Sequence, residues 1–429
     1  MKNGNGLTSS TTLYRASPAH LAGCLSTAGP AAPTCSCART QATGPPKRST
    51  WPGCAPCCFT SDNTAGAAPE IIAAVAAAAS GQAPPYGTDS WTLSARRRFC
   101  EIFDRDVDLL PVSTGSAANA LSLAALTPPW GSVLCHRDSH INNDECGAPE
   151  FFTGGAKLIA LGGENAKIDA DELQAAVHRK VGDVHSAQPS VLSLTQATET
   201  GAVYTPAEIG HLAGIAKHAG LRVHMDGARL ANAVAALGCH PAELTWRAGV
   251  DMLSFGAIKN GTITADAIVV FERSLTTELN FRAKRAGQLA AKMRFAAAQL
   301  DAYLADDLWL RNARHANAMT ARLEEGLKSI PDTRLAGTPQ ANILFCRLPQ
   351  QVIDGLLDEG YGFYHGRWEP GVVRFVTSFA TTTHEVDELV HAVRRLTAAA
   401  SEESRSKRAS TQRSAGGRRS EVACMGRVR

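Results

Sequence analysis

The chain has 429 residues, of which 44% are hydrophobic and 19% are charged, so it can build one large core or two moderate ones. No stretch approaches the ~18 uninterrupted apolar residues of a membrane-spanning helix, which argues against a membrane protein. The net charge of +3 includes +5 in residues 1–61 and +5 in residues 401–429, which leaves about −7 for the centre and argues against nucleic-acid binding.

The first 58 residues form a leader with no hydrophobic periodicity. Three interpretations stay open: a disordered leader, an organelle transit peptide, or sequence upstream of the true start. Six of the twelve cysteines lie here, but no second ligand pair follows at zinc-finger spacing, so we predict no metal site. The other cysteines are scattered singly, which favours a reducing compartment and a cytoplasmic protein.

Short apolar or β-branched runs alternate with helical patterns over residues 59–280. The predicted strands are Leu109–Ser113, Ser132–His136, Lys157–Leu161, Ser190–Thr195, Leu221–Asp226, Val250–Phe255 and Ala267–Phe271. Helical stretches such as Ala117–Leu126, Pro206–Ala219 and Ala228–Leu237 separate several of them. This alternation predicts a large α/β domain on a seven-stranded, mostly parallel sheet that is covered on both faces.

The pattern changes after Phe271, and we expect residues 281–400 to form a smaller α+β domain. Its predicted elements are helices at Arg282–Leu304 and Leu308–Ile330, strands at Asn342–Leu348 and Val372–Thr377, and a closing helix at Glu385–Ala398. Residues 401–429 are too polar to bury a core, so we expect a disordered basic tail.

Ligands of open α/β sheets bind beyond the carboxyl ends of the strands, so polar residues at those positions are the first candidates. Asp226 ends one predicted strand, and Lys259 lies just past the next, in SFGAIKNG. Each has an ordinary alternative, since the aspartate could cap a helix and the lysine could be solvated. Together they are the pair that pyridoxal phosphate needs: an amine that bonds to the cofactor, and a carboxylate that keeps its pyridine nitrogen protonated.

The segment STGSAAN (113–119) follows the first strand and could hold the cofactor's phosphate. Gly115 lets the backbone approach a ligand, and Ser116 begins a helix with free N–H groups. Many α/β proteins contain such a turn. Its glycines do not match G-x-G-x-x-G, and the chain has no G-x-x-x-x-G-K-[ST], so these two fingerprints give nucleotide binding no support.

His140 and Glu145 follow the second strand, in RDSHINNDECGAPE. An imidazole at this position could stack on a pyridoxal ring or exchange protons with a substrate, and a surface histidine is the ordinary alternative.

The ordered set of motifs resembles the L-threonine aldolases, and in particular their bacterial low-specificity and phenylserine-aldolase-like members. The motifs are FTSDN (59–63), YGTDSWT (86–92), STGSAAN (113–119), HINNDECG (140–147), VHSAQPSVLSLTQATETG (184–201), HMDGARLANA (224–233), SFGAIKNG (254–261) and VVRFVTSFATT (372–382). The resemblance implies the pyridoxal-phosphate fold type I of the aspartate aminotransferases. It also implies cleavage of L-threonine, L-allo-threonine or related β-hydroxy-α-amino acids, such as phenylserine, to glycine and an aldehyde.

The same resemblance assigns roles toward the cofactor. It implies that Lys259 holds pyridoxal phosphate covalently and that Asp226 faces the pyridine nitrogen. Gly115 and Ser116 would hold the phosphate, and His140 would stack on the ring.

Toward the substrate, the resemblance implies that Ser61, Arg229 and Arg374 hold the carboxylate, with Arg229 also against the cofactor. Two guanidiniums fix the orientation of a carboxylate as well as its charge. Cleavage of the Cα–Cβ bond needs a base for the β-hydroxyl proton, and His140, His185 or a water molecule are the candidates.

The alternative activity is a β-eliminating lyase that releases an α-keto acid and ammonia from the same lysine and cofactor. An aminotransferase and a non-catalytic binding protein are further alternatives, although the latter has no need to keep this whole residue set. Family members are homodimers or homotetramers with shared active sites, so Tyr86 or the Arg282–Arg285 region is expected near a neighbour's site.

Overall fold

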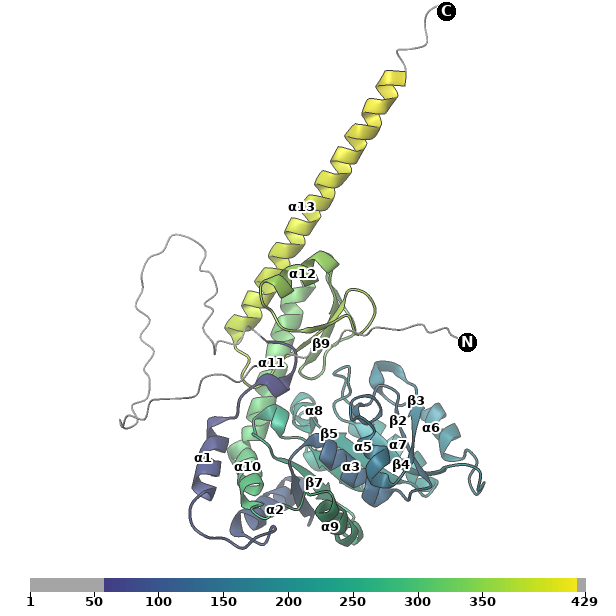
Figure 1. Cartoon of the computed structure of the whole chain (residues 1–429), viewed down its shortest axis with the longest axis vertical. Helices are drawn as coiled ribbons and strands as arrows, with labels where there is room; N and C mark the ends of the chain where they lie inside the picture. The colour runs from purple at the N-terminus through teal and green to yellow at the C-terminus, as the bar shows by residue number, and fades with distance from the viewer. Residues whose placement is uncertain (1–57, 423–429) are drawn as a thin grey trace, which may run out of the picture. The chain divides into compact units, whose positions relative to one another are not determined.

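Seven strands form the main sheet in the structure, a computed structural model that describes residues 58–422 (Figure 1). The strands are β1 (Asp108–Val112), β2 (Gly131–His136), β3 (Lys157–Leu161), β4 (Gln188–Thr195), β5 (Arg222–Gly227), β6 (Met252–Phe255) and β7 (Asp266–Val270). Their order is β1-β7-β6-β5-β4-β2-β3. Only β7 is antiparallel to its neighbours, so β1 runs in the same direction as β6. The predicted seven-stranded, mostly parallel sheet is confirmed.

Helices cover both faces of this sheet. They are α1 (Pro69–Ala78), α2 (Ser90–Phe103), α3 (Gly115–Leu126), α4 (His140–Asn143), α5 (Ala148–Thr153), α6 (Ala170–Val177), α7 (Pro206–His218), α8 (Leu230–Leu237), α9 (Thr276–Arg285) and α10 (Arg294–Leu304). Alternate residues of β2 enter opposite cores: Leu134 packs with residues of α2 and α7, whereas Val133 and Cys135 pack with residues of α3 and α9. Burial on both faces explains why the strands are apolar runs without polar alternation.

A second, antiparallel sheet lies in the C-terminal part, with the strand order β10-β11-β9-β8. Its elements are α11 (Leu308–Lys328), β8 (Arg334–Leu335), β9 (Ile343–Arg347), α12 (Gln350–Asp358), β10 (Tyr364–His365), β11 (Val372–Val376) and α13 (Thr383–Val422). Side chains of α11, α12 and α13 pack on β9 and β11 in a hydrophobic cluster of their own. The predicted smaller α+β part is therefore present, while the limits of the two domains remain a prediction.

Two predicted helices differ from the structure. The helix expected at Arg282–Leu304 is interrupted between α9 and α10, where Gly287 has a φ of 72° and so cannot continue an α-helix. The closing helix, expected to end at Ala398, continues to Val422. The tail expected to be disordered is therefore helical up to Val422. Its sequence is rich in Ser and Arg, and this polarity disfavours burial but not helix formation.

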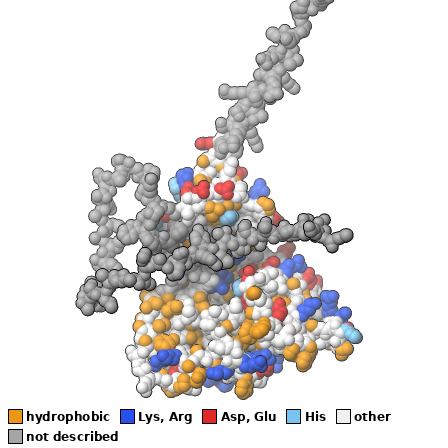
Figure 2. All heavy atoms as spheres, in the orientation of Figure 1, with side chains coloured by type: hydrophobic (Ala, Val, Ile, Leu, Met, Phe, Trp, Pro, Cys, Tyr) orange, Lys and Arg blue, Asp and Glu red, His pale blue; other side chains and the backbone are white. Residues whose placement is uncertain are grey.

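The leader and the surface of the chain bear on the remaining expectations. The zinc-site question and the transit-peptide interpretation fall on a leader of which residues 1–57 lie outside the described residues. Within residues 58–422, none of the helices combines the length and the apolar content needed to cross a bilayer. On the face in Figure 2, Lys and Arg side chains occur in small groups between hydrophobic and neutral ones.

Candidate active site

A cavity of about 410 Å³ lies at the carboxyl ends of the parallel strands. It brings together six of the predicted site residues: Gly115, Ser116, His140, Asp226, Arg229 and Lys259. Asp226 lies at the end of β5, and the others come from the segments that follow β1, β2, β5 and β6, which end at the same edge of the sheet. The position agrees with the general place of ligand sites in open α/β sheets.

The amino end of α3 faces this cavity and is suited to an anion. Thr114 is the N-cap, and its hydroxyl accepts a hydrogen bond from the Ala117 N–H at 3.1 Å. Thr114, Gly115 and Ser116 all line the cavity. The first N–H groups of a helix have no partner within the helix, so this turn offers donors and a positive dipole end to a phosphate.

Asp226 is buried and is held by two hydrogen bonds. Its Oδ1 accepts the Ala228 N–H at 3.0 Å, and its Oδ2 accepts an N–H from Asn119 at 2.9 Å. The N-cap of α8 is Arg229 and not Asp226, so the helix-cap alternative does not describe this aspartate. Its carboxylate is instead fixed in orientation at the floor of the cavity.

The Lys259 loop is anchored from several directions. The Asp266 carboxylate accepts the N–H groups of Ala257 and Ile258 at 2.7 and 3.0 Å. On the other side of the lysine, Asn260 donates to the Tyr303 hydroxyl at 2.6 Å. A Cβ added at Gly256 would lie 2.6 Å from the Ala228 backbone, so only glycine lets this loop approach the end of β5 so closely.

A buried network connects the predicted histidine to the predicted aspartate. His140 Nδ1 lies 2.8 Å from Glu145 Oε1, which also accepts an N–H from Asn119 at 2.8 Å. The hydrogen bond to Glu145 raises the pKa of His140 against the effect of burial, and Asp226 and Glu199 raise it further. Burial raises the pKa of Glu145. The sequence motif contained Glu145, but gave it no role.

Arg229 is paired with an acid that the sequence analysis did not single out. Its Nε and Nη2 donate to the two oxygens of Asp62 at 2.8 and 3.0 Å, and both side chains are buried. Asn342 donates to the same carboxylate at 2.9 Å. Burial alone would raise the pKa of Asp62, but the charges of Arg229 and Lys259 outweigh it and hold this pKa below its usual value. Arg229 therefore lines the cavity while its Nε and Nη2 already donate to Asp62.

Arg374 and Ser61 do not line the cavity, although Arg374 lies close to its charged groups. Its Nε is buried without a hydrogen-bond partner, and its guanidinium stacks 4.6 Å from the centre of the Tyr364 ring. Burial and the nearby Arg229 lower the pKa of Arg374. Ser61 is the N-cap of a short helical turn, where its hydroxyl accepts the Asn63 N–H at 3.2 Å.

Glu199 is a second acid that sequence reasoning missed. It follows β4 and lines the cavity with His140, Arg229 and Lys259. Burial raises the pKa of this carboxyl, against the opposing charge of Arg229. Its position just beyond a strand end was the signal that could have found it.

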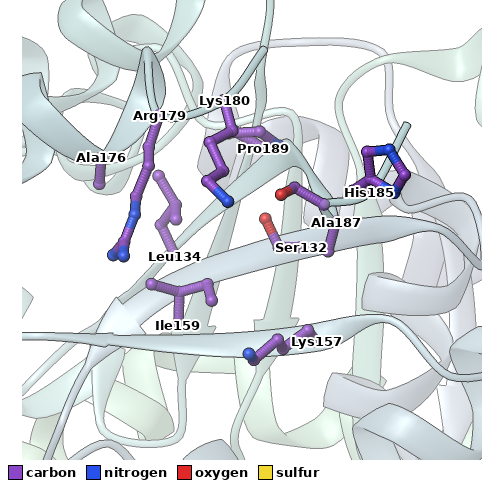
Figure 3. A pocket seen from close by; sticks show the side chains of 11 residues that line it. Ser132, Leu134, Lys157, Ile159, Ala176, Arg179, Lys180, His185, Ala187 and Pro189 are labelled. Atoms are coloured by element: carbon purple, nitrogen blue, oxygen red, sulfur yellow. The ribbon is translucent and has the colours of Figure 1, made fainter. Parts of the chain in front are cut away.

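The structure does not bring His185 into the same cavity, which corrects the expectation that both histidines share one site. His185 precedes β4, so it lies at the amino ends of the strands. There it lines a different cavity of about 290 Å³, with Ser132, Lys157 and Lys180 (Figure 3). Of the two candidate histidines, a single chain supplies only His140 to the cavity at the carboxyl ends.

The model of the beta-eliminating lyase family matches residues 59–348. The chain belongs to the beta-eliminating lyase family. Within residues 59–348 lie all the cavity residues named above, from Gly115 to Lys259.

Relatives of this chain include a low-specificity L-threonine aldolase of Pseudomonas aeruginosa. It is 43% identical over 336 residues, which are 78% of this chain and 96% of the relative. Among solved structures, the threonine aldolase of Leishmania major is 28% identical with a TM-score of 0.75 and covers 79% of this chain and 99% of its own. A Sphingomonas wittichii serine palmitoyltransferase, 16% identical with a TM-score of 0.61, shares the fold over 80% of this chain and 87% of its own. These comparisons confirm the resemblance to the L-threonine aldolases. They also confirm the predicted fold type I.

Enzymes of this family use pyridoxal phosphate, and the residues present fit that group. The cavity is of the size typical of small-molecule sites. It offers an amine at Lys259, a carboxylate at Asp226 and free helix N–H groups at Gly115 and Ser116, which match the aldehyde, the ring nitrogen and the phosphate of the cofactor. The residue roles themselves remain predictions.

Proposed function

We propose that this chain is a pyridoxal-phosphate-dependent aldolase. It cleaves L-threonine, L-allo-threonine or related L-β-hydroxy-α-amino acids, such as phenylserine, to glycine and an aldehyde. The observation that carries the proposal is one cavity that holds Lys259, Asp226 and a histidine whose Nδ1 is hydrogen-bonded to a buried carboxylate. An amine, an acid and a tethered imidazole are the groups that this cleavage needs.

Lys259 would hold the cofactor covalently, and Asp226 would face its ring nitrogen. When bound, pyridoxal phosphate supplies a ring that accepts electrons. The Asp226 carboxyl group has a fixed orientation because Ala228 and Asn119 each donate a hydrogen bond to one of its oxygens. Gly115 and Ser116 bind the phosphate through the amino end of α3.

Arg374 would be the principal partner of the substrate carboxylate. Its Nε is buried and has no partner, so an incoming carboxylate would satisfy it. Arg229 would contribute a remaining N–H, since its Nε and one Nη2 proton serve Asp62. Ser61 would add its hydroxyl if it exchanges its local hydrogen bonds for one to the substrate.

His140 would take the proton of the β-hydroxyl group as the Cα–Cβ bond breaks. With Nδ1 bound to Glu145, its free ring nitrogen is Nε2. An imidazole is suited to this transfer because it gains and loses a proton near neutral pH. We propose His140 in preference to His185, which lines the other cavity.

A product assay tests this function against the β-elimination alternative. The purified holoenzyme is incubated with L-threonine, L-phenylserine, L-serine and L-tryptophan, and glycine, aldehydes, α-keto acids and ammonia are measured. Glycine with acetaldehyde or benzaldehyde supports the aldolase. Pyruvate and ammonia, without glycine from any β-hydroxy amino acid, would refute it. Lys259→Ala should abolish product formation, and Lys157→Ala, in the other cavity, is the matched control.

We also propose a homodimer or homotetramer with shared active sites. Phe281 on α9 and Phe151 on α5 are 71% and 79% exposed, and Tyr86 is 47% exposed against Lys284 of α9. Such large exposed rings are typical of surfaces that a second copy covers. Light scattering should show a stable oligomer that Phe281→Glu weakens.

The six free cysteines of residues 58–422 support the proposal of a reducing, cytoplasmic location.

A further inference from the structure

Glu145, the hydrogen-bond partner of His140, is a buried acid that uses only one of its two carboxylate oxygens. The Glu145 side chain has no exposed surface, yet Oε2 has no hydrogen-bond partner, while Oε1 accepts from both His140 and Asn119. A buried oxygen without a partner destabilises the fold, because it has lost its hydrogen bonds to water and gained none. Because Glu145 also lines the cavity and contacts His140 through its other oxygen, this arrangement points to a role in the site.

The hydrogen bonds of Asn119 determine the direction of the network. Its amide nitrogen lies 2.8 Å from Glu145 Oε1 and 2.9 Å from Asp226 Oδ2. The nitrogen has two hydrogens to donate, whereas the amide oxygen would repel two carboxylates, so the nitrogen must face them. One amide therefore ties Glu145 and Asp226 together.

We propose that Glu145 and Asn119 are positioning residues of the aldolase site: Glu145 keeps the proton of His140 on Nδ1, so that Nε2 is the basic atom, and Asn119 fixes this pair relative to Asp226. An ionised Glu145 can only accept, so the shared hydrogen must belong to His140 Nδ1. The neutral ring then has its lone pair on Nε2. This inference rests on the proposed function and extends it to the residues behind the base.

The charges around His140 predict how the base responds to pH. Glu145, Asp226 and Glu199 all favour the protonated ring, while Lys259 and Arg229 line the same cavity and oppose it. Because the base must be neutral to accept a proton, activity falls as pH drops below the pKa of His140. Removing the Glu145 charge lowers this pKa, so the acidic limb of the activity profile moves to lower pH.

The first test reads the tautomer directly and needs no reaction. Histidine labelled with ¹⁵N is incorporated into the full chain, and the His140 signals are assigned by their loss in His140→Gln. Above its pKa, the neutral His140 of the wild type should show a protonated Nδ1 and an unprotonated Nε2, with and without cofactor. A protonated Nε2 would overturn the proposal.

The second test uses Glu145→Gln, which keeps the shape and removes the charge. We expect the His140 titration and the acidic limb of kcat/KM to move down by about one pH unit, and kcat to fall about tenfold to a hundredfold. KM and cofactor affinity should change less than about twofold. Glu150→Gln is the matched control, a half-buried acid of α5 outside the cavity, and should leave the titration of His140 unchanged.

Asn119→Ala separates the two ends of the network. It should lower cofactor affinity as well as kcat, because Asp226 loses its side-chain donor, whereas Glu145→Gln affects kcat and pH dependence only. If Glu145→Gln makes glycine with an unshifted titration and unshifted profile, the positioning role is refuted while the aldolase stands. If the wild type makes no glycine from any β-hydroxy amino acid, the aldolase itself fails, whatever the tautomer.

Discussion

Removing the carboxylate of Asp62 should destabilise the protein because Arg229 would keep a buried charge without a partner. Asp62 is 2% exposed and Arg229 is 9% exposed, and two short hydrogen bonds join them. Breaking such a buried pair from one side typically costs about 3–5 kcal/mol, much more than the pair adds over an apolar replacement. We therefore expect Asp62→Ala to lower the free energy of unfolding by about 3–5 kcal/mol.

A double-mutant cycle measures the pair itself. Asp62→Ala, Arg229→Met and the double variant are unfolded in urea at a fixed protein concentration and with fixed cofactor. The double variant should be more stable than the sum of the two single losses predicts, by several kcal/mol, because it leaves no unpaired buried charge. The matched control is Asp387→Ala, since Arg322 and Asp387 form the same bidentate geometry at the surface, where no measurable loss is expected.

The pH dependence gives an independent check. The pKa of Asp62 is lower in the folded chain than in the unfolded chain, so its contribution is fully present above the unfolded pKa of ~4 and is lost as pH falls through the folded value. The stability gap between wild type and Asp62→Asn should therefore be constant at neutral pH and narrow under acid. Additive single losses, or a gap that widens under acid, would refute the reasoning.

Three further predictions concern the site and the ends of the chain. Asp226→Ala should retain some cofactor, seen by absorbance, but lose most turnover because the ring nitrogen is no longer held protonated, and near-normal turnover would remove Asp226 from the mechanism. In steady-state assays with L-threonine, His140→Ala should lower kcat by about a hundredfold or more, with a smaller change in KM. An equal loss of kcat in His185→Ala would contradict the choice of His140 as the base. A chain of residues 59–402 should keep wild-type activity and thermal stability, since the packed part of α13 ends near Leu396, and a soluble but inactive product would contradict this.

The positions of Asp226 and Lys259 at the carboxyl ends of strands could be predicted from the sequence, while their roles stay predictions. Asp226 and Lys259 follow apolar runs, and parallel strands bring such positions to one edge of a sheet whatever the loops do. His185 does not lie at this edge, because it precedes β4 and so lies at the amino ends of the strands. The direction of a strand relative to a motif therefore carried the information, and the motif alone did not.

Partners of those residues could not be predicted, because they are distant in sequence and are selected by packing. Asp62 meets Arg229 across 167 residues and Asn342 across 280. Asn119 reaches Asp226 across 107 residues, from a helix whose apolar pattern gives no hint of a polar contact. No periodicity or spacing rule connects such pairs, so their hydrogen bonds appear only when the chain is folded.

The direction in which each pKa shifts at the site depends on these partners and not on residue type. Asp62, Glu145 and Glu199 are all carboxylic acids close to the cavity, yet the paired Arg229 lowers the pKa of Asp62 while burial raises those of Glu145 and Glu199. The first is therefore an anion that balances a fixed guanidinium. Burial makes the other two carboxyl groups harder to ionise, and at Glu145 the hydrogen bonds with His140 and Asn119 oppose this effect. The sequence alone cannot tell these three acids apart, because the direction of each pKa shift depends on which side chains surround the acid in the folded chain.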